Sequence, residues 1–263
     1  MNILYIGDVM AEPGIKVVEQ VLPSLRKKEG VALVIAQAEN VSDGKSMSPV
    51  DMRRLQKAGV DFFTGGNHTP SKQEIIPLLE DPYQPVIGPA NMVNCPGPGY
   101  KYIETPSGKV LIVSLLGQIV GNSQPETTNP LQVINKILQE QASTKHVLTI
   151  IDFHGDYSSE KVIISYYLDG QVTAVVGDHW HVPSADAEVL PKGTARIADV
   201  GMCGSLDSSL GVKFDSVIPR WLDGQQTRNE IEEGGRMQFN ALLIEADPQS
   251  GLAKSAKHIR QVF

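Results

Sequence analysis

Polar residues of the kinds that bind metal ions recur in this sequence where short apolar runs end. Five such segments are Gly7-Asp8, Ala38-Glu39-Asn40, Gly66-Asn67-His68, Asp152-Phe153-His154 and Asp178-His179-Trp180-His181. Imidazole, carboxylate and amide oxygen together suit divalent transition metals such as iron, manganese or zinc. The segments therefore predict a metal site that is assembled from distant parts of the chain.

Histidine is scarce in this chain, which makes its distribution informative. Four of the six histidines follow predicted strands, namely His68, His154, His179 and His181. Taken alone, each candidate has an ordinary structural alternative: Asp8 suits a helix N-cap, Glu39 a solvated loop, and His154 a buried core position. The joint pattern at successive strand ends is what favours a metal site over these alternatives.

Two metal ions would use this set of ligands better than one. A carboxylate can bridge two cations that lie about 3.5–4 Å apart, and Glu39 is the candidate bridge. Sites of this kind activate a shared water for in-line attack on phosphorus, and a neighbouring imidazolium can protonate the leaving oxygen. The residue types thus predict hydrolysis of a phosphoester.

The segments that carry these residues alternate between strand and helix patterns. Six mostly continuous apolar runs predict strands that are covered on both faces: Asn2–Ile6, Ala32–Ala36, Asp61–Thr64, Val110–Leu116, Val147–Ile151 and Val172–Val176. Helices are expected over residues 13–28, with a kink or restart at Pro23, after the N-caps Ser48 and Asn129, and over residues 158–168. Because ligand clefts lie outside the carboxyl ends of strands in open α/β sheets, the polar segments can converge there.

The last third of the chain has a different pattern. Met237–Ala246 and Ala256–Val262 predict closing strands, and a helix is expected near Ser205–Val217. Stretches rich in proline and glycine, residues 85–99 and 121–130, are interpreted as loops or subdomain insertions rather than domain boundaries. The sequence shows no internal repeat or linker, so we expect a single domain over residues 1–263.

Composition narrows the class of protein. The 263 residues are 41% hydrophobic, and their net charge is -7, from 30 acidic and 23 basic residues. Such a chain can build a core, and its acidity disfavours a broad nucleic-acid surface. No apolar run could span a bilayer and no signal-peptide pattern is present, so we expect a cytoplasmic protein. Cys95 and Cys203 lack metal-site spacing and are expected to be reduced thiols.

Together these segments resemble the YmdB-like branch of the calcineurin-like metallophosphoesterases. The resemblance runs in order along nearly the whole chain, through Gly7-Asp8-Val9, Ala38-Glu39-Asn40, Gly66-Asn67-His68-Thr69, Asp152-Phe153-His154, Ser159-Glu160-Lys161, residues 177–182, residues 190–195 and Asp199-Val200-Gly201-Met202. It implies an α/β fold, a four-layer α/β/β/α sandwich, with a dinuclear metal centre between the sheet ends.

The resemblance also implies a role for each candidate residue. One metal would be held by Asp8, Glu39, Asn40 and His181, and the second by Glu39, Asn67, His154 and His179. His68 would be the general acid. The branch is similar to phosphodiesterases that hydrolyse 2′,3′-cyclic or related cyclic nucleotides by in-line attack of a metal-bridging hydroxide. The expected cofactors are two divalent or trivalent ions, iron or manganese first and zinc as an alternative.

Four positions depart from the family pattern. Met10 stands where the broader superfamily usually has a histidine, so Asn40 is expected to supply the missing ligand. Pro70, Asp156 and Trp180 differ from the usual residues around the pocket, which leaves the physiological substrate open.

Alternative functions therefore remain. The expected partner is a small phosphodiester or nucleotide, and a homo-oligomer is possible. A metal- or nucleotide-binding regulatory protein with little turnover, or a phosphomonoesterase on the same site, would retain the same ligands. The acidic charge disfavours a nuclease. Four further residues are candidates for orienting phosphate or the ligand loops, with helix capping or surface solvation as alternatives: Ser159, Lys161, Lys192 and Thr194.

Overall fold

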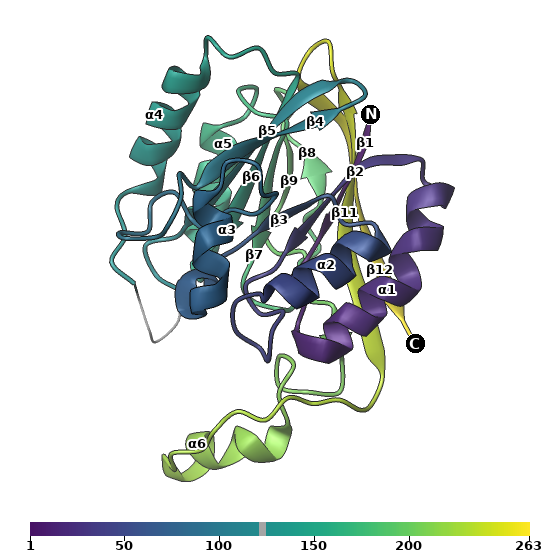
Figure 1. Ribbon diagram of the computed structural model, residues 1–263, viewed down its shortest axis with the longest axis vertical. Helices are drawn as coiled ribbons and strands as arrows, with labels where there is room; N and C mark the ends of the chain where they lie inside the picture. The colour runs from purple at the N-terminus through teal and green to yellow at the C-terminus, as the bar shows by residue number, and fades with distance from the viewer. Residues whose placement is uncertain (121–124) are drawn as a thin grey trace.

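Two β-sheets packed face to face form the centre of the protein. The computed structural model describes residues 1–120 and 125–263 (Figure 1). The first sheet has the strand order β10-β11-β1-β2-β3 with β12 paired to β11: β1 (Asn2–Ile6), β2 (Val31–Gln37), β3 (Phe62–Thr64), β10 (Gly204–Ser205), β11 (Met237–Asp247) and β12 (Leu252–Val262). The second has the order β4-β5-β6-β7-β9-β8: β4 (Tyr100–Thr105), β5 (Gly108–Leu116), β6 (Leu148–His154), β7 (Ala174–Asp178), β8 (Glu188–Val189) and β9 (Ala195–Ile197).

The strands that carry the candidate ligands are parallel to their neighbours. In the first sheet β1 pairs with β2 and β2 with β3, both in parallel. In the second sheet β5, β6, β7 and β9 pair in parallel in that order. The carboxyl ends of parallel neighbours lie at one edge of a sheet, so each sheet presents its polar strand ends together.

Both faces of the central strands are buried, which explains their continuous apolar runs. In β1, Ile3 and Tyr5 face the second sheet, whereas Leu4 and Ile6 face the outer helices of the first sheet. Successive side chains of a strand point to opposite faces, so a strand covered on both sides needs apolar residues at every position. β5 follows the same rule, with Ile112 between the sheets and Val113 against the helices outside.

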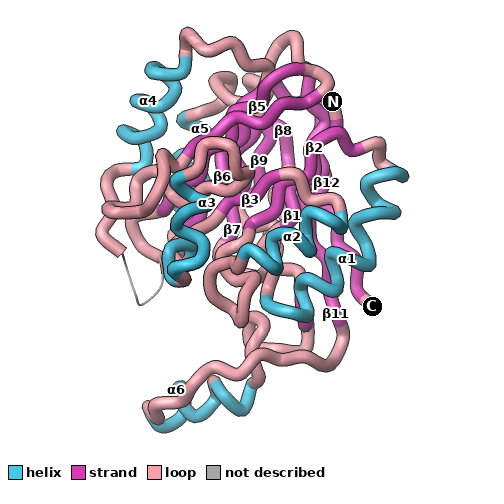
Figure 2. The backbone as a smooth tube through the Cα atoms, viewed as in Figure 1, coloured by secondary structure: helices cyan, strands magenta, loops and turns pink. Residues whose placement is uncertain are grey.

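Helices cover the outer faces of the two sheets. The helices are α1 (Ala11–Lys28), α2 (Pro49–Ala58), α3 (Ile76–Glu80), α4 (Pro130–Gln141), α5 (Ser158–Tyr167) and α6 (Ile218–Asp223), with 3-10 turns at Thr69–Ser71, Gln73–Ile75 and Phe214–Ser216. Apolar residues of α1 and α2 pack on the first sheet, and those of α4 and α5 pack on the second. Figure 2 shows the strands enclosed by these helices. The predicted four-layer α/β/β/α sandwich is confirmed.

The predicted strands are all present, and all but β1 have bounds that differ from the prediction by one to four residues. β6 and β7 begin later than expected and continue to His154 and Asp178, so part of the fourth and fifth polar segments is strand. The helix does not restart at Pro23, because α1 continues through this residue as one element. Pro23 is exposed, and water can bind the carbonyl that it leaves without a partner. Residues 121–124 of the predicted loop 121–130 lie outside the described part of the chain.

The prediction of a helix near Ser205–Val217 is wrong. This region opens a projection between β10 and β11, residues 206–236, which we call the arm (Figure 1). Leu210 and Gly211 both have positive φ, 57° and 97°, and a helix cannot pass through two left-handed residues. The arm's one α-helix is α6, which begins after Val217 with Pro219 in its first turn.

The cysteines and the helix lengths can be compared with the expectations from the sequence. Cys95 and Cys203 are free thiols. Among the described residues, no helix has both the length and the apolar character needed to cross a membrane.

Candidate metal centre

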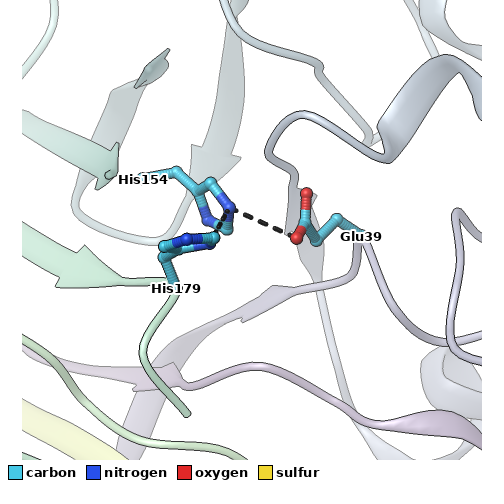
Figure 3. Close-up of side chains that lie close together, drawn as sticks. All are labelled: Glu39, His154 and His179. Atoms are coloured by element: carbon cyan, nitrogen blue, oxygen red, sulfur yellow. Dashed lines mark hydrogen bonds and ion pairs between the residues drawn. The ribbon is translucent and has the colours of Figure 1, made fainter. Parts of the chain in front are cut away.

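The predicted ligands of both sheets meet in one cluster. Glu39 follows β2, His154 ends β6 and His179 follows β7, and their ligand atoms lie within 4.8 Å of one another. Figure 3 shows the three side chains pointing toward one another from different elements. His154 is fully buried and Glu39 is 2% exposed. The convergence that the sequence predicted for these three residues is present.

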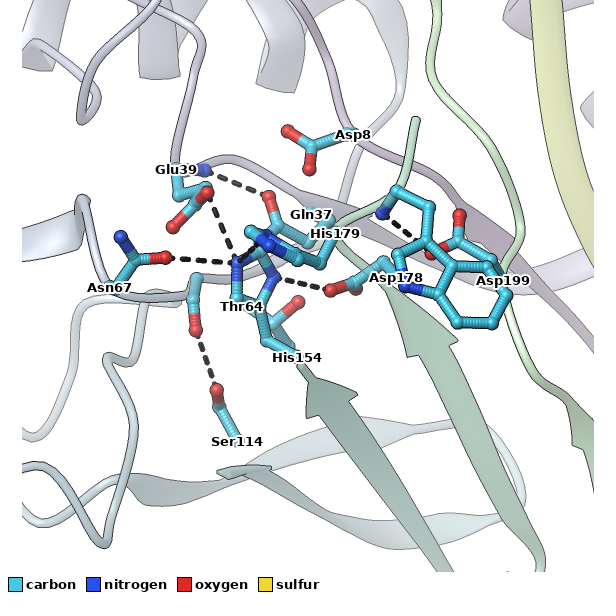
Figure 4. A network of polar contacts seen from close by, with 12 residues as sticks. Asp8, Gln37, Glu39, Thr64, Asn67, Ser114, His154, Asp178, His179 and Asp199 are labelled. Carbon is cyan, nitrogen blue, oxygen red and sulfur yellow. Dashed lines mark hydrogen bonds and ion pairs between the residues drawn. The ribbon is translucent and has the colours of Figure 1, made fainter. Parts of the chain in front are cut away.

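His154 is the centre of this cluster. Its Nε2 lies 3.2 Å from Glu39 Oε1, 3.1 Å from Asn67 Oδ1 and 2.9 Å from His179 Nδ1. Its other nitrogen, Nδ1, donates to Asp178 Oδ1 at 2.6 Å (Figure 4). A carboxylate bonded to one imidazole nitrogen fixes the ring and directs the other nitrogen toward a metal. Glu39, Asn67, His154 and His179 thus form one group of ligand atoms.

The buried carboxylates around His154 need a positive charge beside them. Burial opposes the charged form of His154, yet Glu39 and then Asp178 raise its pKa well above the ordinary value. Burial would raise the pKa of Glu39, but His154 and His68 lower it below its usual range. In the metal-free protein a proton on His154 therefore provides the positive charge that the buried carboxylates require.

A second group also contacts Glu39, at the same oxygen, Oε1. Asn40 Nδ2 donates to Asp8 Oδ1 at 2.9 Å and to Glu39 Oε1 at 3.2 Å, and His181 Nε2 lies 3.3 Å from Asp8 Oδ2. That Asp8 oxygen is buried and makes no hydrogen bond among the described residues, so the ion-pair contact with His181 is what offsets its charge. A buried carboxylate oxygen left in this state is suited to a cation. The chemistry and burial of the two groups therefore fit a pair of metal ions that share Glu39.

The side-chain amide of Asn40 has the opposite orientation to the one that a metal ligand would need. Its Nδ2 faces Asp8 and Glu39, while its Oδ1 accepts a hydrogen bond from His68 Nδ1 at 2.9 Å. Metals bind the amide oxygen and not the nitrogen, so the amide would have to rotate for Asn40 to act as a ligand.

His68 lies beside the ligand atoms rather than among them. Its backbone N–H donates to Glu39 Oε2 at 2.9 Å, and its side chain is 36% exposed at the edge of the cluster. Gly66, two residues earlier, permits this close approach. A Cβ at that position would lie 2.4 Å from Glu39 Oε2 and 2.5 Å from His154 Cδ2, so a larger residue would displace both side chains.

The loop after β7 holds two histidines in unusual backbone conformations. His179 and His181 have φ values of 105° and 62°, in the region that favours glycine. Lys161 Nζ donates to Asp178 O at 2.5 Å, to Ala198 O at 2.9 Å and to Asp199 Oδ2 at 3.1 Å. The buried ion pair of Lys161 and Asp199 therefore ties the start of this loop to α5 and to the segment after β9.

Two of the departures from the family pattern support the same loop. Asp156 Oδ1 lies 2.9 Å from His179 Nε2, which directs His179 Nδ1 toward His154. Trp180 donates from its backbone N–H to Asp199 Oδ2 at 2.8 Å and from Nε1 to Asp156 O at 2.9 Å. The ammonium of Lys161 lies 4.3 Å from the centre of the Trp180 ring. These residues orient the ligand loop. Burial of His179, and next the charge of His154, lower the pKa of His179 to about 4.

Several residues of the site have roles that sequence reasoning missed. Asp178 orients His154, and Tyr5 donates to Asp178 Oδ2 at 2.9 Å. Gln37 Oε1 accepts from Glu39 N at 2.9 Å (Figure 4). Ser114 of β5 donates to Gly65 O at 2.6 Å and so ties the second sheet to the loop of Asn67. The available signal was a polar residue within or at the end of an otherwise apolar run.

Of the four further candidates, only Lys161 touches the ligand loops. Ser159 and Lys192 are exposed, as the surface-solvation alternative predicted. Thr194 is buried and donates to Val172 O at 2.7 Å. Met10 is buried and packs in an apolar cluster with Met202 and Val212.

The buried ion pair gives a testable expectation for stability. We expect Lys161→Met to lower the free energy of unfolding by about 3–5 kcal/mol, because Asp199 would remain buried without its cation. The matched control is Lys192→Met, at an exposed lysine, with a change within about 0.5 kcal/mol. Urea unfolding in the presence of a chelator measures both variants. Equal stability of the two variants would contradict a structural role for Lys161.

Comparison with known proteins places this geometry in a family. The sequence profile of YmdB-like proteins matches residues 4–259. A 2′,3′-cyclic-nucleotide 2′-phosphodiesterase of Bacillus subtilis is 34% identical over 260 residues, which cover 98% of this chain and 96% of that protein. The crystal structure of a Mycoplasma pneumoniae phosphatase has a TM-score of 0.92 at 31% identity, covering 100% of this chain and 93% of that one. A hypothetical protein of Thermus thermophilus has a TM-score of 0.90 at 33% identity, covering 100% and 99%. The chain therefore belongs to the YmdB-like protein family, and it has the metallophosphoesterase fold.

Proposed function

We propose that this protein is a two-metal phosphodiesterase that hydrolyses 2′,3′-cyclic nucleotides or related cyclic phosphodiesters. Family membership makes it a phosphoric ester hydrolase, and the name of the Bacillus subtilis relative suggests the substrate class. The observation that carries the proposal is the pair of ligand groups that share Glu39, one of them with a buried Asp8 oxygen that makes no hydrogen bond among the described residues and lies 3.3 Å from His181 Nε2.

Each ligand group would hold one metal. Asp8, Glu39, His181 and, after rotation of its amide, Asn40 would hold the first metal. Glu39, Asn67, His154 and His179 would hold the second. Imidazole with carboxylate and amide oxygen suits iron or manganese, with zinc as an alternative. When bound, the two ions would neutralise charge on the phosphoryl oxygens and make water acidic enough to supply the nucleophile.

His68 is suited to protonate the leaving oxygen. In the orientation found, Asn40 Oδ1 accepts from His68 Nδ1, so an imidazolium keeps its Nδ1 proton and presents a second proton on Nε2 to the substrate. If the Asn40 amide rotates to act as a ligand, Glu39 Oε1, which lies 3.6 Å from His68 Nδ1, would have to accept that Nδ1 proton instead. The side chain lines the cavity that contains the ligand groups, at the edge that remains open to solvent. A proton on Nε2 can pass to the ribose oxygen as its bond to phosphorus breaks, which leaves a neutral imidazole and a free hydroxyl.

His68→Ala tests this role. We expect the variant to hydrolyse 2′,3′-cyclic AMP about 10²- to 10⁴-fold more slowly with its metal content unchanged, because a proton donor is lost but no ligand. His146→Ala removes a histidine outside the cluster and is the control. Full activity of His68→Ala would exclude the residue from the mechanism.

A substrate panel with the metal-loaded wild type decides between the proposed activity and its alternatives. Hydrolysis of 2′,3′-cyclic AMP in preference to AMP, an aryl phosphate and RNA supports a phosphodiesterase. Preference for AMP or the aryl phosphate would instead indicate a phosphomonoesterase. Binding of the cyclic nucleotide without turnover would indicate a regulatory protein.

Metal binding should depend on pH through His181. Burial lowers the pKa of His181, but the Asp8 carboxylate outweighs this effect and raises it to about 9. At pH 7 the metal-free protein therefore carries a proton on His181, which must leave before the imidazole can bind a metal. We expect metal affinity to rise as the pH increases from 7 toward 9.

Calorimetry of manganese binding in two buffers with different ionisation enthalpies measures this proton release. The apparent binding enthalpy should differ between the buffers for the wild type and for His146→Ala, and the difference should be smaller for His181→Asn. Equal enthalpies in both buffers, with an affinity that does not change between pH 7 and 9, would contradict metal binding by His181.

A further inference from the structure

The arm, residues 206–236, forms a wall of the cavity that contains the ligand groups. The cavity has a volume of about 500 Å³, and Glu39, His68 and His179 line its polar part. The arm contributes its remaining apolar part, which includes Leu210, Val212, Val217 and Trp221. This volume is typical of a site for a whole small molecule and exceeds what a phosphate group alone would occupy. The cavity thus has a charged end for phosphate and an apolar end for the rest of a substrate.

Both tryptophans of the chain line this cavity, but they are held differently. Trp180 is fixed by its hydrogen bond to Asp156 and by Lys161 over its ring. Trp221, on α6, is 86% exposed. A large aromatic surface left in water at the mouth of a site gains free energy when a flat ligand covers it.

We propose that Trp221 is the nucleobase-binding residue of this site and stacks on the base of the cyclic nucleotide. The proposal rests on the proposed function, since it places the phosphate at the ligand groups and the base against the arm. Stacking of a base on an aromatic side chain contributes about 1–3 kcal/mol and tolerates every base, because each has a π-face.

The arm is fastened so that Trp221 has a defined position. Arg220, the preceding residue, donates from Nε to Thr227 Oγ1 at 2.5 Å and from Nη2 to Ser216 O at 2.9 Å, and it also bonds Asn229 Oδ1. These bonds close the turn that carries α6. Arg220 is therefore a positioning residue for Trp221, and its Nε and Nη2 are used within the arm.

The base of the arm is attached to the ligand groups themselves. Val212, Val217 and Ile231 pack with Met10, two residues after Asp8. Leu210 O accepts a hydrogen bond from His181 Nδ1 at 3.0 Å, which directs His181 Nε2 toward Asp8. Met10, which stands where the superfamily usually has a histidine, thus anchors the arm. The same segment that presents Trp221 also orients a candidate metal ligand.

Two polar side chains of the arm, Arg220 and Asn229, line the cavity with Trp221, and Arg220 Nη2 donates to Asn229 Oδ1. This bond holds the two side chains to each other, so stacking on Trp221 is the contact with the base that we propose. Stacking without base-edge hydrogen bonds predicts similar rates for 2′,3′-cyclic nucleotides of all four bases.

The experiment compares two substrates with the same reacting group. One is 2′,3′-cyclic AMP, and the other is methyl riboside 2′,3′-cyclic phosphate, in which a methoxy group replaces the base. We expect Trp221→Ala to reduce the ratio of their kcat/KM values about 5- to 150-fold, mainly through KM of the nucleotide. Trp221→Phe should restore most of the ratio, because an aromatic face is retained.

Leu222→Ala is the matched control. Leu222 is the neighbouring residue of the same helix, is 74% exposed, and is not among the residues that line the cavity. We expect it to leave the ratio unchanged. The proposal would be overturned if Trp221→Ala had the same ratio of kcat/KM values as the wild type. It would also be overturned if Leu222→Ala lowered this ratio as much as Trp221→Ala does. A Trp221→Ala variant that differs from the wild type only in its oligomeric state by sedimentation would overturn it too, because the arm would then be a subunit interface.

Binding separates this proposal from the proposed function. Calorimetry of metal-loaded protein with adenosine 2′-monophosphate measures stacking without turnover. If the wild type hydrolyses neither cyclic phosphate but Trp221→Ala still weakens nucleotide binding at least about 5-fold, base stacking is supported and the proposed function fails. If the wild type hydrolyses both substrates and Trp221→Ala binds the nucleotide as tightly as it does, the proposed function stands and the stacking role is wrong.

Discussion

Buried carboxylates that must share a positive charge dominate this structure. Glu39, Asp8 and Asp178 are at most 2% exposed, and they lie against imidazoles rather than against arginine or water. Charges removed from water are costly unless each is paired. In the metal-free protein, protons on His154 and His181 and the amide of Asn40 offset this charge. Metal ions would replace those protons, so the charges of the cluster suit cation binding before any substrate is considered.

The two-sheet fold is the means of assembling that cluster. The first sheet supplies Asp8, Glu39 and Asn67 after β1, β2 and β3, and the second supplies His154 and His179 at and after β6 and β7. Neither sheet holds a complete ligand group, so the packing between the sheets sets the geometry. Contacts that cross from one layer to the other, such as Ser114 to Gly65 and Tyr5 to Asp178, fix that packing at the site itself.

Much of the architecture was predictable because it depends on local pattern. Continuous apolar runs mark strands that are buried on both faces, and the polar residues that end them mark the edge where the candidate ligands gather. The seven candidate ligands and His68 could be chosen in this way. The roles of Asp178 and Gln37 could not, because a polar residue at a strand end gains its meaning from a partner on another strand. The arm was predicted wrongly for a similar reason: Gly211 lies against Met10, and this long-range contact, together with the left-handed Leu210, excludes the helix that the local pattern suggested.

The central claim is that two cations bind around a shared Glu39. Metal content per chain, measured by mass spectrometry after reconstitution with manganese and removal of free metal, tests it directly. The account predicts about two ions per wild-type chain and loss of both from Glu39→Gln, whose fold is checked by circular dichroism. Wild-type protein that retains no metal, or a folded Glu39→Gln variant that still holds about two ions, would contradict it.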